Sequence, residues 1–111
     1  FIEPEVAEFG MSEEEAKQAG YDVIVERMPF SFNGRAIAAA ETEGFVKIIS
    51  ESKYREILGA VVVGTNGAEL IHQILTVYES EGTVDELAHT VFSHPTVSEL
   101  IQDVAKRMIK K

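Results

Sequence analysis

The sequence predicts an α+β domain in which a mainly antiparallel β-sheet is packed by helices on one side. Strand-like apolar patterns dominate up to residue 63, whereas apolar residues at helical spacing dominate after it. The two clearest strand patterns are separated only by a short polar turn, which indicates an antiparallel hairpin. We therefore expect a single domain over residues 1–111.

The composition indicates a folded, soluble protein. With 111 residues, of which 45% are hydrophobic, the chain can bury a core without disulfides, and it contains no cysteine. A formal net charge of -9 disfavours nucleic acid as a partner and suits a basic protein. No apolar run reaches the roughly 20 residues that span a bilayer. We expect a cytoplasmic protein without membrane contact, and a start at Phe1 suggests a domain cut from a longer chain.

The N-terminal segment is expected to contain a strand and a helix. Residues 1–9 are broken by Pro4, which suits a turn or an edge position that leads into a short strand. Ser12 and Glu15 have the spacing of a capping box, in which each residue satisfies a backbone amide of the other. A helix is therefore expected over residues 13–19, ending at Gly20.

Three further strands are expected before residue 64. Residues 21–28 alternate and read as a half-buried strand. The segment 30–40 fits either a short helix or an extended crossover, and its periodicity does not decide between them. Residues 44–50 and 57–63 are the two clear strands, and the polar residues 51–56 join them as a hairpin.

The turn over residues 64–67 joins the last strand to a helix. It lacks both glycine-rich phosphate-binding fingerprints, so Asn66 is expected to cap the helix. The helix that follows carries one apolar stripe at helical spacing, for which packing in a core or in an interface is the explanation. This stripe comprises Leu70, Ile71, Ile74, Leu75 and Tyr78.

Two more helices are expected towards the C-terminus. Thr83 and Glu86 form another capping-box spacing and start a short helix that runs to about Thr90. The final helix begins after Pro95 and ends in basic residues, which suits the helix dipole. Its inward positions are Val97, Leu100, Ile101, Val104, Ala105 and Met108.

The histidines are the candidates for proton transfer, because imidazole titrates near neutral pH. His72 follows Glu69 in an E-x-x-H spacing, but a di-iron site needs a second such pair, so we expect no metal and place His72 on a helix surface. His89 and His94 are too few for a zinc site without cysteine. No G-x-S-x-G motif supports a serine hydrolase.

His94 has the most distinctive setting. Pro95 restricts the backbone of His94 to extended conformations, so that the imidazole projects from a corner at the mouth of the last helix. Glu99 lies one helical turn further on, where its carboxylate is expected to orient the imidazole as a base. A second reading stays open, because Thr96 and Glu99 also have capping-box spacing, which leaves His94 as a surface residue.

The segment HPTVSE, residues 94–99, resembles the His-Pro-Thr-x-Ser-Glu signature of the pyridine nucleotide-disulfide oxidoreductases. Further agreement with the C-terminal dimerisation domain of that family covers essentially the whole chain, and the Ala-Glu-Leu-Ile-His run resembles dihydrolipoamide dehydrogenases more than glutathione reductases. Two positions depart from the pattern, Ile2 and Phe92. The matching segments are residues 1–7, 10–13, 35–36, 43–49, 57–60 and 67–72.

The resemblance implies a site shared between subunits of a homodimer. His94 is expected to reach the redox disulfide of the other subunit, with Glu99 orienting it, and the main chain of His94 and Pro95 is expected to approach the flavin of that subunit. FAD, NAD and the redox cysteines are implied to belong to preceding domains, so the isolated chain is expected to be inactive.

Two functions are therefore carried forward. The first is the interface domain of a dihydrolipoamide dehydrogenase, which supplies an acid/base pair for oxidation of a dihydrolipoyl thiol. The same domain of a related reductase, such as glutathione reductase, is an alternative to it. The second is a module for oligomerisation or partner docking, with the basic segment of a lipoyl-bearing acyltransferase as the expected partner.

Overall fold

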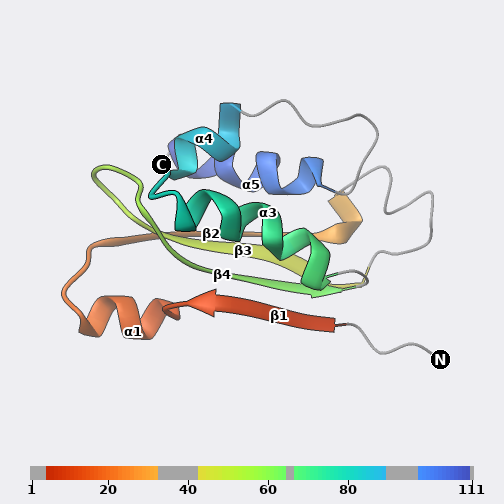
Figure 1. Cartoon of the computed structure of the whole chain (residues 1–111), viewed down its shortest axis with the longest axis horizontal. Helices are drawn as coiled ribbons and strands as arrows, with labels where there is room; N and C mark the ends of the chain where they lie inside the picture. The colour runs from red at the N-terminus through yellow and green to blue at the C-terminus, as the bar shows by residue number, and fades with distance from the viewer. Residues whose placement is uncertain (1–4, 33–42, 65–66, 90–97, 111) are drawn as a thin grey trace.

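The computed structural model describes residues 5–32, 43–64, 67–89 and 98–110 (Figure 1). Each strand and helix expected from the sequence is present within a few residues of its expected bounds, and the segment after Pro29 starts as a short 3-10 turn. The remainder of the segment 30–40, and Asn66, lie outside the described residues. The elements are β1 (Glu5–Gly10), α1 (Glu13–Gln18), β2 (Val23–Pro29), η1 (Phe30–Phe32), β3 (Phe45–Glu51), β4 (Ile57–Gly64), α3 (Gly67–Glu79), α4 (Val84–His89) and α5 (Glu99–Ile109).

The described strands form one 4-stranded antiparallel sheet in the order β1-β4-β3-β2. The predicted hairpin between β3 and β4 is confirmed, with Ile48 opposite Ala60. An irregularity between Ile49 and Ser50 shifts the register near the end of the hairpin. A bulge of this kind adds local twist to a strand. The sheet is the platform on which the helices lie.

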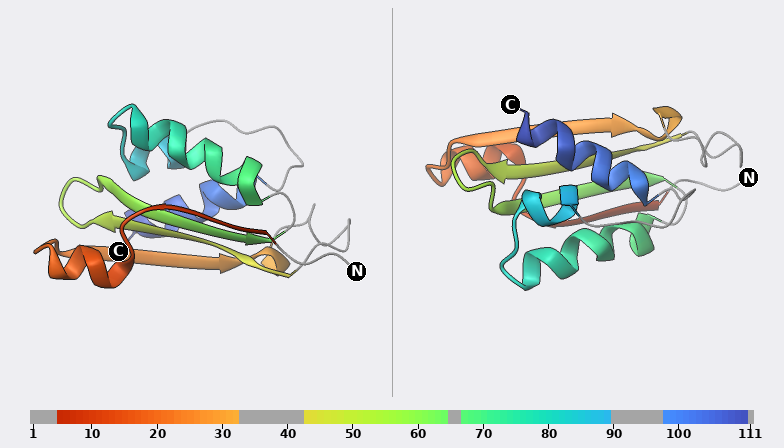
Figure 2. Two further views of the ribbon diagram at one scale, coloured as in Figure 1. Left: turned by 60° about the horizontal axis from the view of Figure 1, so that its bottom comes forward. Right: turned by 90° about the horizontal axis from the view of Figure 1, so that it is seen from above.

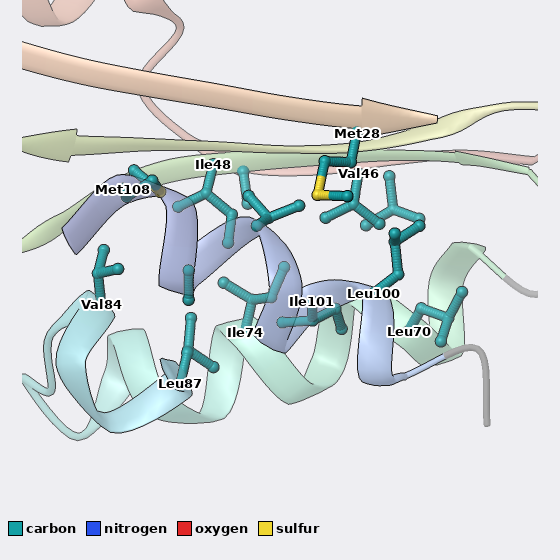
Figure 3. Close-up of a cluster of buried hydrophobic side chains, with 14 of the residues drawn as sticks. Met28, Val46, Ile48, Leu70, Ile74, Val84, Leu87, Leu100, Ile101 and Met108 are labelled. Carbon is teal, nitrogen blue, oxygen red and sulfur yellow. The ribbon is translucent and has the colours of Figure 1, made fainter. Parts of the chain in front are cut away.

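The main core lies between the sheet and the layer formed by α3, α4 and α5 (Figures 2 and 3). The inward positions predicted for the last helix are confirmed wherever the structure describes them, because α5 buries one complete face against β2 and β3. Removal of this apolar surface from water is the main stabilising contribution to the domain. The buried residues of α5 are Leu100, Ile101, Val104, Ala105 and Met108.

The apolar stripe of α3 divides between two environments. Leu70, Ile71 and Ile74 are buried in the main core, so core packing explains this part of the stripe. Tyr78, at the end of the helix, is 38% exposed, and its ring lies 4.8 Å from the ring of Phe9 on β1. Leu75 is half-buried. The stripe is therefore mainly a core face.

The helix α1 lies on the opposite face of the sheet from the other helices, so the helices do not all pack on one side as expected (Figure 2). Its capping box between Ser12 and Glu15 is confirmed, with both hydrogen bonds present. Ala16 is buried against Ile49 and Leu58, which belong to the face that α3, α4 and α5 leave open. Covering these two side chains is the physical reason for the position of α1.

Between β1 and α1, the backbone of the chain passes very close to the backbone of β4. A Cβ atom on Gly59 of β4 would collide with the carbonyl oxygen of Met11, the residue that follows β1. Only glycine fits at such a position.

None of the helices in the described part of the chain combines the length and the apolar character that a membrane span requires.

Candidate functional site

The site expected from the sequence lies at the start of α5. His94, Pro95 and Thr96 lie outside the described residues, so the pairing of His94 with Glu99 and the cap by Thr96 stay predictions. Glu99 is the first residue of α5 and is half-buried. The next two residues, Leu100 and Ile101, are fully buried. Glu99 therefore stands on a backbone that the core holds in place.

The first residue of α5 is Glu99, and the two residues that directly follow Pro95 lie outside the described residues. Ser98 occupies the N-cap position, and its side chain makes no capping hydrogen bond. Instead, Nε2 of Gln73 on α3 donates to Oγ of Ser98 over 2.7 Å. The hydroxyl of Ser98 is thus engaged by a neighbouring helix, which local capping rules do not anticipate.

A second amide lies between α5 and α4. Nε2 of Gln102 on α5 donates to the carbonyl oxygen of Ala88 over 3.0 Å. Ala88 is next to the last residue of α4 and is buried, as are Val84 and Leu87 on the same helix. Glutamine side chains therefore bind described residues on both sides of the segment 90–97: Gln102 binds Ala88 before it, and Gln73 binds Ser98 after it.

The first turn of α4 is in turn held by the β3–β4 hairpin. Nε and Nη2 of Arg55, in the hairpin, donate to Oδ1 and Oδ2 of Asp85, and the Nη2–Oδ2 distance is 3.0 Å. The hydrogen bond from Arg55 and its positive charge lower the pKa of Asp85 against partial burial, which acts in the opposite sense. The amide of Val84 also donates to the carbonyl oxygen of Arg55. A bidentate pair of this type fixes direction as well as distance.

Two histidines lie within the described residues, and both are exposed. Nδ1 of His72 bonds to the carbonyl oxygen of Ala68, and Nδ1 of His89 bonds to that of Asp85, in each case one turn earlier on the same helix. The expectation that His72 lies on a helix surface is confirmed. The described part of the chain holds no group of three or more residues suited to a metal ion.

An acidic cleft opens where the start of β4 meets the end of α3. Its volume is about 780 Å³, and three of its residues are glutamates, which come from two separate parts of the chain. The convergence of these glutamates was not anticipated from the sequence, since Glu56 is far from the other two along the chain. The acidic cleft is lined by Glu56, Ile57, Tyr78, Glu79, Glu81 and Gly82.

Comparison with known proteins identifies the family. Residues 1–105 match the family model described as the pyridine nucleotide-disulphide oxidoreductase dimerisation domain. The chain belongs to this family, as the resemblance in its sequence predicted. Among curated relatives, the dihydrolipoyl dehydrogenases of Rhizobium etli and Mycobacterium leprae are 44% and 39% identical over 103 residues, which is 93% of this chain.

Solved structures agree in fold. LpdA from Mycobacterium tuberculosis superposes with a TM-score of 0.87 at 30% identity over 95% of this chain. The HOCl-induced flavoprotein disulfide reductase RclA from Escherichia coli superposes with a TM-score of 0.86 at 29% identity over 91% of this chain. The α+β fold predicted from the sequence is therefore confirmed.

The chain is much shorter than these relatives. It covers 21% and 22% of the length of the two dehydrogenases and 23% of LpdA. Dinucleotide cofactors bind where a glycine-rich turn joins a parallel strand to a helix. The described strands are antiparallel throughout, so the described residues do not form this type of dinucleotide-binding fold.

Proposed function

We propose that this chain is the dimerisation domain of a dihydrolipoyl dehydrogenase that acts as a homodimer in the cytoplasm. The observation that carries the proposal is the identity of about 40% with enzymes of that name across 93% of the chain. The activity assigned to the full-length protein is oxidation of protein-bound dihydrolipoamide to lipoamide with reduction of NAD.

The part of the reaction assigned to this chain is proton transfer. His94 takes a proton from a dihydrolipoyl thiol, because an alkyl thiol, like free cysteine with its pKa of about 8.5, is mostly protonated at neutral pH. The thiolate attacks one sulfur of the redox disulfide in the other subunit, forming a mixed disulfide and releasing the second cysteine as a thiolate. The second dihydrolipoyl thiol then attacks the lipoyl sulfur of the mixed disulfide, which forms the lipoyl disulfide and releases the first cysteine, so that both cysteines are reduced and hold the two electrons.

Glu99 is assigned the role of orienting His94. A carboxylate beside an imidazole fixes its tautomer and favours its protonated form. The position of Glu99, half-buried at the first residue of a helix whose next two residues are in the core, supports this role. FAD and NAD belong, in this proposal, to other domains of the full-length protein, with the main chain of His94 and Pro95 near the flavin of the other subunit.

The test is the substitution His94→Gln in the full-length protein. We expect turnover of dihydrolipoamide to fall roughly a hundredfold or more, because general-base catalysis contributes at least that factor. Flavin content, measured by absorbance, and dimer mass, measured by sedimentation, are expected to stay unchanged. Near-normal turnover in this variant contradicts the proposal.

His89→Gln is the matched control. His89 is exposed on α4 and bonds to a carbonyl oxygen of its own helix. We expect this variant to turn over dihydrolipoamide at the wild-type rate. Comparison of the two variants shows whether the loss of turnover is specific to His94 or follows from the removal of any histidine close to α5.

A second function, docking of a basic partner, is favoured by the acidic cleft. Three glutamates face one open cleft in a chain whose formal net charge is -9. The partner assigned to it is the basic segment of a lipoyl-bearing acyltransferase, which would keep the dehydrogenase near its lipoyl substrate. The two functions are compatible in one full-length protein.

A further inference from the structure

We propose that Gln73 is a positioning residue for the proton-transfer pair, acting through Ser98 at the start of α5. This inference rests on the proposed function of His94 and Glu99. Gln73 itself touches no reacting group. Its role is to hold the backbone from which Glu99 projects.

The hydrogen bond between Gln73 and Ser98 crosses two helices that are far apart in the sequence. Nε2 of Gln73 donates to Oγ of Ser98 over 2.7 Å, and both residues are half-buried. Oε1 of Gln73 is buried, and within the described part of the chain it accepts no hydrogen bond. A buried carbonyl oxygen without a donor costs stability. An apolar side chain would avoid this cost, but it would also lose the hydrogen bond to Ser98.

The position of Ser98 makes the bond relevant to the site. Ser98 directly precedes Glu99, and its carbonyl oxygen accepts from the amide of Ile101, which closes the first turn of α5. The Ser98 side chain does not cap the helix. The bond from Gln73 therefore links the side chain of Ser98 to the neighbouring helix.

Gln73 is well placed to fix the position of Ser98, because the core holds the residue that follows Gln73 in place. Ile74 is fully buried in the main core, where it lies near Ile101 of α5 (Figure 3). Gln102 holds α5 to the end of α4 one turn further along, through the backbone of Ala88. Loss of the Gln73 amide is thus expected to release only the first turn of α5, while the rest of the helix stays in place.

A small movement at Ser98 is expected to affect catalysis strongly. Displacement of a catalytic group by about 1 Å can reduce a rate by a large factor, because proton transfer depends on alignment. Movement of Glu99 also changes the charge felt by His94, and with it the pH at which the base titrates. A purely structural role for Gln73 would leave that pH unchanged.

The experiment compares three variants of the full-length protein: Gln73→Leu, Ser98→Ala and the double variant. The matched control is Gln18→Leu, since Gln18 is exposed at the end of α1 on the other face of the sheet. The first measurement is hydrogen exchange of the amides in the first turn of α5, including Ile101. We expect faster exchange in the three variants and no change in the control.

The second measurement is the pH profile of kcat/KM for dihydrolipoamide. We expect a loss of about tenfold or more in Gln73→Leu, with a displaced acidic limb of the profile. The double variant is expected to be no worse than the more impaired single variant, because both changes remove the same contact. Reduction of ferricyanide by NADH, which needs no proton transfer from a thiol, is expected to stay at the wild-type rate.

Three outcomes decide the matter. If hydrogen exchange in the first turn of α5 is unchanged in Gln73→Leu, then Gln73 does not hold the start of α5 and the proposal is wrong. Faster exchange with a wild-type pH profile and kcat/KM overturns the positioning role. A wild-type protein that does not oxidise dihydrolipoamide overturns the proposed function and the catalytic part of this inference, whereas faster exchange would still support the hold on α5.

Discussion

At the scale of single residues, the end of α3 contains a strained position. The amide of Gly82 donates to the carbonyl oxygen of Val77 over 2.8 Å, and the amide of Glu81 donates to that of Tyr78. These two bonds define a Schellman motif, in which the residue after the C-cap adopts a left-handed conformation. Glu81 occupies this position with φ of 59°. Glycine is the usual residue there, because a Cβ atom is disfavoured at positive φ.

Replacement of Glu81 by glycine is therefore expected to stabilise the domain. Relief of the left-handed conformation outweighs the larger entropy of glycine in the unfolded chain, and we expect a gain of about 0.5–1 kcal/mol in the free energy of unfolding. Urea denaturation of the domain measures this change. Glu79→Gly, inside the last turn of α3, is the control and is expected to lower stability by about 1 kcal/mol. A destabilised Glu81→Gly variant would contradict this account.

At the scale of elements, α4 owes its position to the hairpin rather than to its own length. It has 6 residues, too few for a stable isolated helix. Its first turn is held by the Arg55–Asp85 pair and by the side chain of Glu86, which accepts from the amide of Thr83 over 2.8 Å. These contacts connect the hairpin to the helix that precedes the candidate site.

The Arg55–Asp85 pair is expected to make stability depend on pH. Its contribution is fully present above the unfolded pKa of aspartate, about 3.9, and is lost as the pH falls through the lower folded pKa. Asp85→Asn is therefore expected to lower the urea midpoint at pH 7, with a smaller difference from the wild type at pH 3. Asp103→Asn on α5 is the control. An equal difference at both pH values would show that charge plays no part.

At the scale of the whole molecule, charge is the property most relevant to partners. The formal net charge of -9 produces a negative field around the domain, and the acidic cleft concentrates part of it at one place. Fields of this kind raise association rates and are screened by salt, with a Debye length of about 10 Å at 0.1 M. Docking of a basic segment at the cleft is therefore testable by its dependence on salt.

Binding of a peptide with the sequence of the basic acyltransferase segment is expected to weaken as salt rises. Calorimetric titration at increasing ionic strength measures this dependence. The double substitution of Glu56 and Glu79 by glutamine is expected to reduce both the affinity and its salt dependence. The same changes at Glu13 and Glu14 on α1 are the control for net charge. Binding that is insensitive to salt would remove the electrostatic argument for docking.

The sequence was sufficient for features that depend on neighbouring residues. The capping box of Ser12 and the buried face of α5 follow from spacings of three or four residues, and both are present as predicted. The candidate pair of His94 and Glu99 also came from local spacing, together with the resemblance of residues 94–99 to a family signature. Local hydrogen bonds and periodicity determine these features, so no knowledge of the chain path is needed.

Only the tertiary structure decided which distant residues meet. The place of α1 on the second face of the sheet depends on Ile49 and Leu58, and the meeting of Glu56 with Glu79 depends on where β4 begins beside α3. The start of α5 is the clearest case, because Ser98 directly precedes this helix, yet its hydroxyl accepts a hydrogen bond from Gln73 on another helix. Such contacts depend on how the sheet and helices pack, and packing is a property of the whole chain.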